Sequence, residues 1–200
     1  MKHHAAVMGD GYEKGEEKFG WLTSVGYLIV TKLGALKAIY AFALNDIIAS
    51  GSKSILDIGT GVAELPLGLG ARRNLEIFAV DPSAAMVRIA KFRTRGCSNI
   101  RIALGSSRHI PFKRRFSLIV STLSFHHWAN RDEALLYLKG FLTKNGEIRI
   151  YEYNKSNLKG PARMARAHSM DKDDFEELAR RSGLKVRVYT NSEFIKAVFR

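Results

Sequence analysis

Short apolar runs alternate with helical patterns along most of the chain. Five apolar runs, bounded by glycine, polar or charged residues, have the length and composition of β-strands: 53–59, 75–81, 100–106, 116–122 and 147–153. Between them, apolar residues recur at helical spacing over 63–73, 83–95 and 131–143. Because strands that alternate with helices form parallel sheets covered on both faces, this pattern predicts an α/β fold.

The last 30 residues carry a different pattern. A helix is predicted over about 171–182, and two more apolar runs follow it at 184–190 and 192–199. The link between these two runs, at Asn191-Ser192, is short, and so short a link connects antiparallel neighbours. We therefore expect a seven-stranded, mostly parallel sheet that ends in an antiparallel hairpin.

Residues 19–50 form the most apolar stretch of the chain, and three charged residues interrupt it: Lys32, Lys37 and Asp46. Its longest uncharged run, 19–31, is shorter than the ~20 residues that a membrane span needs. We therefore expect helices that are buried or that form a lid, and no integral membrane segment. Three aromatic residues are candidates to line a lid: Tyr12, Phe19 and Trp21.

The bulk composition is that of one globular domain. The 200 residues are 46% hydrophobic and 26% charged, which suits a single domain with a full core. Cys97 is the only cysteine, so the chain has no internal disulfide and no Cys/His spacing for a zinc site. This cysteine usage fits a reducing, cytoplasmic location, and the first residues lack the pattern of a signal peptide.

The formal net charge of +13 changes this picture, because it favours an anionic partner such as RNA. Residues 82–131 contain no Asp or Glu. Five of the cations in this stretch precede the third and fourth strands, at the end of the sheet opposite a ligand site: Arg95, Arg101, Lys113, Arg114 and Arg115. A solvated basic surface explains the charge equally well.

A second acid-free basic stretch, 154–168, follows the fifth strand and is expected to border the ligand site.

Glycines and polar residues stand where the predicted strands end. Gly59 and Gly61 follow Asp57 at the end of the first strand, and Asp81 closes the second. The third and fourth strands end at Gly105-Ser106 and at Ser121-Thr122. Because ligands of parallel sheets bind beyond the carboxyl ends of the strands, these residues predict a site for a nucleotide-like ligand.

Two ligands compete for this site, nicotinamide dinucleotide and S-adenosylmethionine. Asp81 lies 24 positions after Asp57 and suits the ribose hydroxyls of either ligand, so it does not decide between them. Glu64 stands where the dinucleotide fingerprint needs its third glycine, and its charge would repel a pyrophosphate. Asp57 suits a ligand that carries an ammonium and a sulfonium group, which favours S-adenosylmethionine.

From this turn onward the chain resembles the class I S-adenosylmethionine-dependent methyltransferases. "ILDIGTGVA" resembles their glycine-rich first motif, "VDPSAAMVRIAK" resembles their second, and "LGSSRHIPF" occupies the place of their third. The run 116–152, with its double histidine, is similar to the small-molecule, quinone-biosynthesis-type branch. The resemblance implies one Rossmann-like domain over 1–200, in which 1–50 form a helical lid and 51–200 the cofactor-binding core.

The resemblance also implies the residues that bind the cofactor: Asp57, Gly59, Thr60, Gly61, Ala63, Asp81, Pro82, Met86, Ser106, Ser107 and Ser121. Ala63 replaces the third glycine of the family motif, and its small side chain should be tolerated. Ser106 replaces a frequent acid, and its hydroxyl can still accept a hydrogen bond from the adenine amino group, less strongly. Alternatives stay open: Asp81 as the N-cap of the helix over 83–95, and Met86 as a core residue.

His126 and His127 follow the fourth strand, where the family binds its substrate. Imidazole titrates near neutral pH, so either histidine is a candidate to remove a proton from a nucleophilic oxygen or nitrogen. The alternative is that one histidine packs or caps while the other is solvated, and that positioning carries catalysis alone. Trp128 is expected to form a pocket wall.

The favoured function is therefore methyl transfer to a small-molecule or lipid-like acceptor. "STLSFHHW" lacks the Asn/Asp-Pro-Pro-Tyr/Phe-like run of enzymes that methylate base amino groups. The alternatives are an RNA-associated methyltransferase and a non-catalytic S-adenosylmethionine-binding protein.

Overall fold

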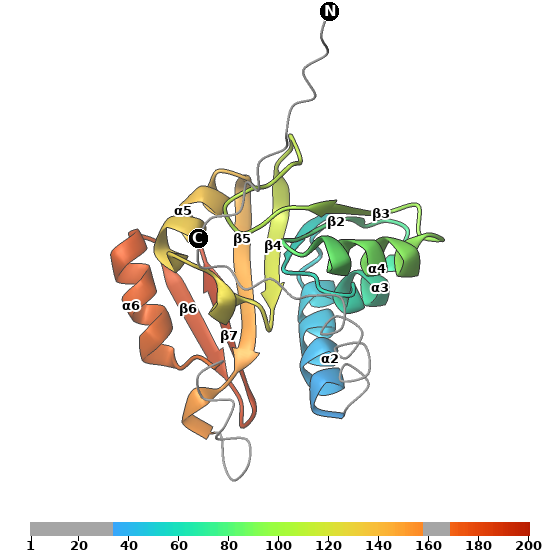
Figure 1. Ribbon diagram of the computed structural model, residues 1–200. Helices are drawn as coiled ribbons and strands as arrows, with labels where there is room; N and C mark the ends of the chain where they lie inside the picture. The colour runs from blue at the N-terminus through green and yellow to red at the C-terminus, as the bar shows by residue number, and fades with distance from the viewer. Residues whose placement is uncertain (1–33, 158–168) are drawn as a thin grey trace, which may run out of the picture.

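The computed structural model describes residues 34–157 and 169–200. Seven strands form one sheet of order β3-β2-β1-β4-β5-β7-β6 (Figure 1). Their bounds are β1 Ser54–Ile58, β2 Glu76–Asp81, β3 Ile100–Leu104, β4 Phe116–Thr122, β5 Leu142–Tyr153, β6 Val186–Thr190 and β7 Phe194–Phe199. The first five strands are parallel, and β7 pairs antiparallel with both β5 and β6. The predicted sheet and its C-terminal hairpin are confirmed.

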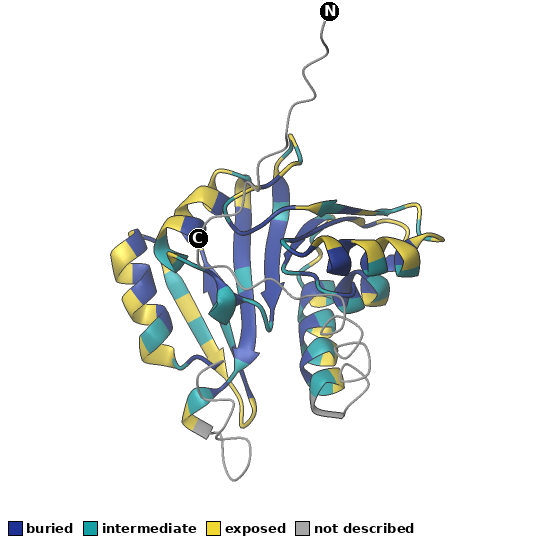
Figure 2. Ribbon diagram, in the orientation of Figure 1, coloured by how far each residue is buried: buried dark blue, intermediate teal, exposed yellow. Residues whose placement is uncertain are grey.

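Within the described ranges, five α-helices cover the two faces of this sheet: α2 Gly34–Ala49, α3 Glu64–Gly70, α4 Ala84–Thr94, α5 Arg131–Lys139 and α6 Lys172–Ser182. One core lies under α2 and α3, a smaller one under α4, and the largest lies between the sheet and α5 with α6. Successive side chains of β4 point to opposite faces of the sheet: Leu118 and Val120 join the core under α2, and Ile119 joins the core under α5. Figure 2 shows the central strands buried on both faces, as a doubly covered sheet requires.

The fifth strand begins earlier than predicted, and α5 ends earlier. β5 starts at Leu142, which pairs with Phe116, and the register shifts before Leu118 pairs with Glu147. Residues 143–145 are exposed and polar, so no apolar run marked this part of the strand. Gly146 allows the irregularity, because a Cβ there would lie 2.9 Å from the Phe116 carbonyl oxygen.

The apolar N-terminal stretch is described only from residue 34 onward. There α2 is of the buried kind, since Ile39, Ala43 and Ile47 are fully or almost fully buried against the sheet. Three predicted lid aromatics and three of the cations after the fifth strand lie outside the described residues: Tyr12, Phe19, Trp21, Lys159, Arg163 and Arg166. Within the described ranges, no helix is both long and apolar enough to cross a membrane.

Asp46 fixes α2 to the sheet, although in the sequence it only interrupts an apolar stretch. Its carboxylate accepts hydrogen bonds from Arg149 and Lys196, both at 2.6 Å, and from the Tyr151 hydroxyl at 2.8 Å. Burial tends to raise the pKa of Asp46, but the bonds from Lys196 and Tyr151 and the charge of Arg149 outweigh it and hold the pKa below its ordinary value.

Candidate functional site

The turn between β1 and α3 has an unusual backbone. Gly59, Gly61 and Ala63 have φ angles of 73°, 54° and 66°, all in the left-handed region. The amides of Gly59 and Thr60 both donate to the Val80 carbonyl, at 2.9 and 3.0 Å, so the turn folds over the end of β2. Ala63 adopts at the N-cap of α3 the conformation that glycine adopts without strain, at a cost of roughly 1 kcal/mol.

The loop after β4 packs directly on this turn. A Cβ at Gly59 would lie 2.3 Å from Ser124 Oγ, so only glycine fits at this position. Ser124 Oγ donates to the Ile58 carbonyl at 2.8 Å and lies 2.7 Å from Ser121 Oγ. Leu123, at φ 54°, turns the chain to bring Ser124 there. The sequence singled out Ser121 but gave no sign of the contact that Ser124 makes.

Asp81 organises the carboxyl edge of the sheet. Its Oδ2 accepts from the Gly61 amide at 2.8 Å, and its Oδ1 accepts from the Ser83 amide at 2.9 Å. The N-cap of α4 is Ser83, whose Oγ accepts from the Met86 amide, so the alternative role of Asp81 as that cap is wrong. A carboxylate has about four acceptor sites, so holding the turn is compatible with binding ribose hydroxyls.

Asp57 lies fully inside this site. Burial raises its pKa to about 7; the neighbouring Thr60 side chain lowers it, and the nearby charge of Asp81 raises it. Among residues 34–157 and 169–200, no cation lowers this pKa, so the ionised form of Asp57 lacks a compensating charge there. A cationic ligand at this edge would supply one, which fits the ammonium and sulfonium groups of S-adenosylmethionine.

The remaining predicted ligands lie in segments that reach the same edge. Ser106 and Ser107 are buried in the turn after β3, and the Gly105 amide donates to the Asp81 carbonyl. Pro82 follows β2, and Met86 is buried in the first turn of α4. Their contacts with a cofactor stay predictions.

Two hydroxyls at this edge are unsatisfied. Thr60 in the glycine turn is 5% exposed and Thr122 at the end of β4 is 4% exposed, yet the Oγ1 atoms of both have no hydrogen-bond partner among the described residues. Because unpaired buried hydroxyls are costly, both threonines are candidates for a ligand contact. With Asp57 and the glycine turn, they make the edge a fitting site for a polar, cationic cofactor.

His126 is held by an acid that the sequence analysis did not single out. His126 Nδ1 lies 3.0 Å from Glu152 Oε2, and Glu152 is completely buried at the end of β5. The other carboxylate oxygen accepts from the amides of Phe125 at 3.0 Å and of His126 at 3.4 Å. With Nδ1–H donating to Glu152, the neutral ring carries its lone pair on Nε2. The ring of His127 lies 4.0 Å from that of His126, centroid to centroid.

The 3-10 turn η1, Phe125–His127, is fixed from two sides. Arg131 donates to the carbonyls of Phe125 and His126, at 3.1 and 2.6 Å. Trp128 is 7% exposed and packs edge to face on Phe125 in the α5–α6 core, with ring centroids 4.9 Å apart. Trp128 therefore anchors this turn from the core, and its role as a pocket wall stays a prediction.

Two charges behave differently from their sequence interpretation. Glu64 pairs with Arg93 at 2.7 Å, so its repulsion of a pyrophosphate is weaker than predicted. Lys155, a cation of the basic stretch after the fifth strand, pairs with Asp171 and Asp174 at 3.4 and 3.2 Å. Its charge is therefore compensated locally.

In the described ranges, no group of three or more His, Cys, Asp or Glu side chains could hold a metal ion.

Comparisons with known proteins show similarity to methyltransferases. Residues 55–146 match a family model described as a methyltransferase domain. An uncharacterised methyltransferase of Staphylococcus carnosus is 30% identical over 115 residues, which are 56% of this chain and 53% of the relative. The chain thus spans about half the length of the curated relatives it matches.

Solved structures share the fold. A Methanococcus maripaludis protein named for S-adenosylmethionine-dependent methyl transfer superposes with a TM-score of 0.75 at 21% identity, over 94% of this chain and 96% of its own. The O-methyltransferase NcsB1, solved with S-adenosylhomocysteine and 1,4-dihydroxy-2-naphthoic acid, superposes with a TM-score of 0.62 at 19% identity, over 73% of this chain and 48% of its own.

Proposed function

We propose that this chain carries a class I S-adenosylmethionine-dependent methyltransferase domain and that it methylates a hydroxyl or amine of a small-molecule acceptor. The observation that carries the proposal is the buried His126–Glu152 pair, which stands at the same edge of the sheet as the glycine turn. A buried acid that orients a histidine is the arrangement of a general base.

Four residues would hold the cofactor: Asp57, Gly59, Gly61 and Asp81. When bound, S-adenosylmethionine supplies a methyl group on a sulfonium, which is a good leaving group. Asp57 and Asp81 would balance its positive charge and bind its ribose, and the glycine backbone gives it room.

In the proposed mechanism His126 removes the acceptor proton. Nε2 takes the proton from the O–H or N–H group of the acceptor, which raises the nucleophilicity of that atom. Glu152 keeps Nδ1–H in place and stabilises the imidazolium that forms. Water exclusion at this edge is favoured by the buried Phe125 and Trp128 behind the turn.

The small size of the acceptor is supported by two observations. The segment after β4 lacks the motif of base-amino methylases, and the structurally similar NcsB1 was solved with a dihydroxynaphthoic acid. We further propose that residues 1–200 act as one domain, with 1–50 beside the cofactor-binding core.

An acceptor screen tests the proposal. The full chain is incubated with S-adenosylmethionine labelled in the methyl group and with phenols, naphthoates, amines, quinols and RNA in separate reactions. We expect label in a small molecule, and much less with His126→Asn. Label in RNA alone, or in no acceptor although the cofactor binds, would contradict the proposal.

A further inference from the structure

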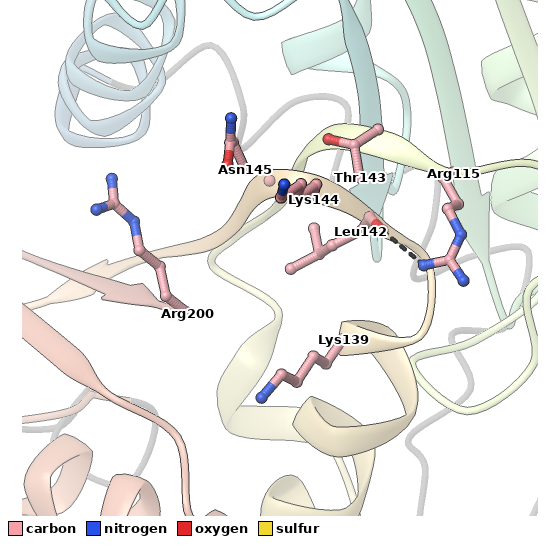
Figure 3. A pocket seen from close by; sticks show the side chains of 8 residues that line it. Arg115, Lys139, Leu142, Thr143, Lys144, Asn145 and Arg200 are labelled. Carbon is pink, nitrogen blue, oxygen red and sulfur yellow. Dashed lines mark hydrogen bonds between the residues drawn. The ribbon is translucent and has the colours of Figure 1, made fainter.

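A cavity of about 750 Å³ lies at the opposite end of the sheet from the candidate active site (Figure 3). It is bordered by the start of β5 at Leu142, the end of α5 at Lys139, the residue before β4 and the end of β7. Because Leu142 and Glu152 are ten residues apart on β5, the cavity and the histidine pair are separated by roughly 30 Å.

Four cationic side chains surround this cavity, and no acid lines it: Arg115, Lys139, Lys144 and Arg200. Arg115 is held in place by donating to the Leu142 carbonyl at 2.8 Å, and Arg200 by an ion pair with Glu147 at 2.7 Å. Among the described residues, neither Lys139 nor Lys144 has an acidic partner within ion-pair distance. Glu147 is shared with Arg149, so it compensates little of the total positive charge.

The irregular start of β5 brings these charges together. Residues 143–146 interrupt the pairing between β4 and β5, so Lys144 and Asn145 project beyond the sheet. Figure 3 shows the cationic side chains arranged around Leu142, with Asn145 above them. Gathering like charges costs free energy through repulsion, and a bound anion removes this cost.

We propose that this cavity binds a small anion that carries one or more phosphate groups, at a site separate from that of methyl transfer. Its volume falls in the range of small-ligand sites. Arg115 offers a planar fork that matches phosphate oxygens, and the two lysines offer mobile point charges. Arg200 donates to Glu147 through Nε and Nη2, so only its other N–H groups can reach an anion. Asn145 and Thr143 add neutral hydrogen-bonding groups. The separation of roughly 30 Å excludes this anion as the methyl acceptor.

Calorimetric titration of the full chain with pyrophosphate, at low ionic strength, tests this proposal. The double variant Lys139→Ala/Lys144→Ala removes the two unpaired cations. A matched control, Arg88→Ala/Lys91→Ala, removes the same charge from the exposed side of α4. We expect the Kd for pyrophosphate to rise at least about tenfold in the first variant and less than about twofold in the control. S-adenosylhomocysteine binding and the melting temperature verify that each variant is folded.

Titration with adenosine diphosphate distinguishes the source of the phosphate. Tighter binding than that of pyrophosphate, lost in the Lys139/Lys144 variant, indicates a nucleotide, whereas equal binding indicates a free phosphate compound. Absence of pyrophosphate binding to the parent protein overturns the proposal. Equal weakening in both double variants, or binding of RNA alone, also overturns it, because either result reflects general surface charge.

Discussion

Asp57 links pH to both folding and cofactor binding. Its ordinary pKa is 3.8, and burial raises the pKa in the folded protein to about 7. Between these two values the folded state binds more protons than the unfolded state, so the free energy of unfolding falls as pH rises from about 4 to 7. Asp57→Asn should remove this component and be more stable than the parent above about pH 7. Urea unfolding of the parent and of the variant from pH 5 to 8 measures the pH dependence and the difference in the free energy of unfolding.

Cofactor binding should show the opposite dependence on pH at the same residue. Because a cationic ligand favours ionised Asp57, S-adenosylmethionine affinity should rise by up to about tenfold from pH 6 to 7 and then level off. Calorimetry in two buffers of different ionisation enthalpy should detect proton release at pH 6. Affinity that does not change with pH would place the ammonium and sulfonium groups away from Asp57.

Asp81 should contribute to cofactor affinity beyond its structural bonds. Asp81→Ala removes an acceptor for both ribose hydroxyls, so affinity should fall by about 2–3 kcal/mol, roughly 30- to 150-fold. Ser83→Ala is the control, because it removes the α4 cap and costs about 1 kcal/mol of stability without touching the ribose. Equal affinities in these two variants would restrict Asp81 to holding the turn.

The two histidines should differ in their effect on catalysis. His126→Asn should lower kcat by about 10²–10⁴-fold with cofactor affinity preserved, because it removes the base. Glu152→Gln keeps an acceptor for Nδ1–H but removes the charge, and should lower kcat by about tenfold or more. His127→Asn should affect KM more than kcat. A larger kcat loss in the His127 variant than in the His126 variant would reverse the assignment.

Several residues at this site were accessible to sequence reasoning because each lies at the carboxyl end of a strand or directly after it. Asp57, Gly59, Gly61 and Asp81 are of this kind, and the structure brings them to one edge. Glu152 was missed, although its position at the end of the fifth strand was predicted. Its contact with His126 joins residues 26 positions apart, and only the pairing of β4 with β5 brings them together.

At the scale of elements, the glycine turn and the loop after β4 act as one unit. Gly59→Ala should destabilise the protein by more than about 2 kcal/mol, because it adds both a left-handed alanine and a collision with Ser124. Gly51→Ala is a matched control: Gly51 has φ 69° but nothing within 4 Å of a Cβ, so only the conformational cost of about 1 kcal/mol applies. Chemical unfolding of both variants measures the difference, and equal losses would show that Ser124 can move aside.

The hold of α2 on the sheet should depend on Asp46. Asp46→Ala leaves Arg149 and Lys196 without this partner and should lower the free energy of unfolding by about 2–3 kcal/mol. Asp132→Ala is the control, because the ion pair of Asp132 with Arg181 is more exposed and such pairs contribute about 0–1 kcal/mol. Similar losses in both variants would mean that the apolar face of α2 holds the helix by itself.

The bounds of β4 and of β5 were predictable from the sequence to different degrees, and burial is the physical reason. β4 has the predicted bounds, because both of its faces are buried and the apolar run 118–120 marks its centre. The start of β5 was missed because residues 143–145 are polar and exposed, which is also typical of a loop. The burial of β4 therefore made it predictable from the sequence, and the exposure of the start of β5 made that segment unpredictable.

At the scale of the whole molecule, the number of strands was predictable but the order of the last two was not stated. β7 is inserted between β5 and β6, so it is buried on both faces, and β6 forms the exposed edge (Figure 2). The sequences differ accordingly, with "FIKAVF" nearly continuous in apolar residues and "VRVYT" mixed. This contrast is the signal that could have given the order.

Binding of S-adenosylmethionine at the glycine edge of the sheet is the basis of the proposed methyl transfer. It is tested by calorimetric titration of the full chain, at pH 7.5, with S-adenosylhomocysteine and separately with NAD. We expect saturable binding of S-adenosylhomocysteine, a higher melting temperature in its presence, and no heat from NAD. Binding of NAD without binding of S-adenosylhomocysteine would contradict it.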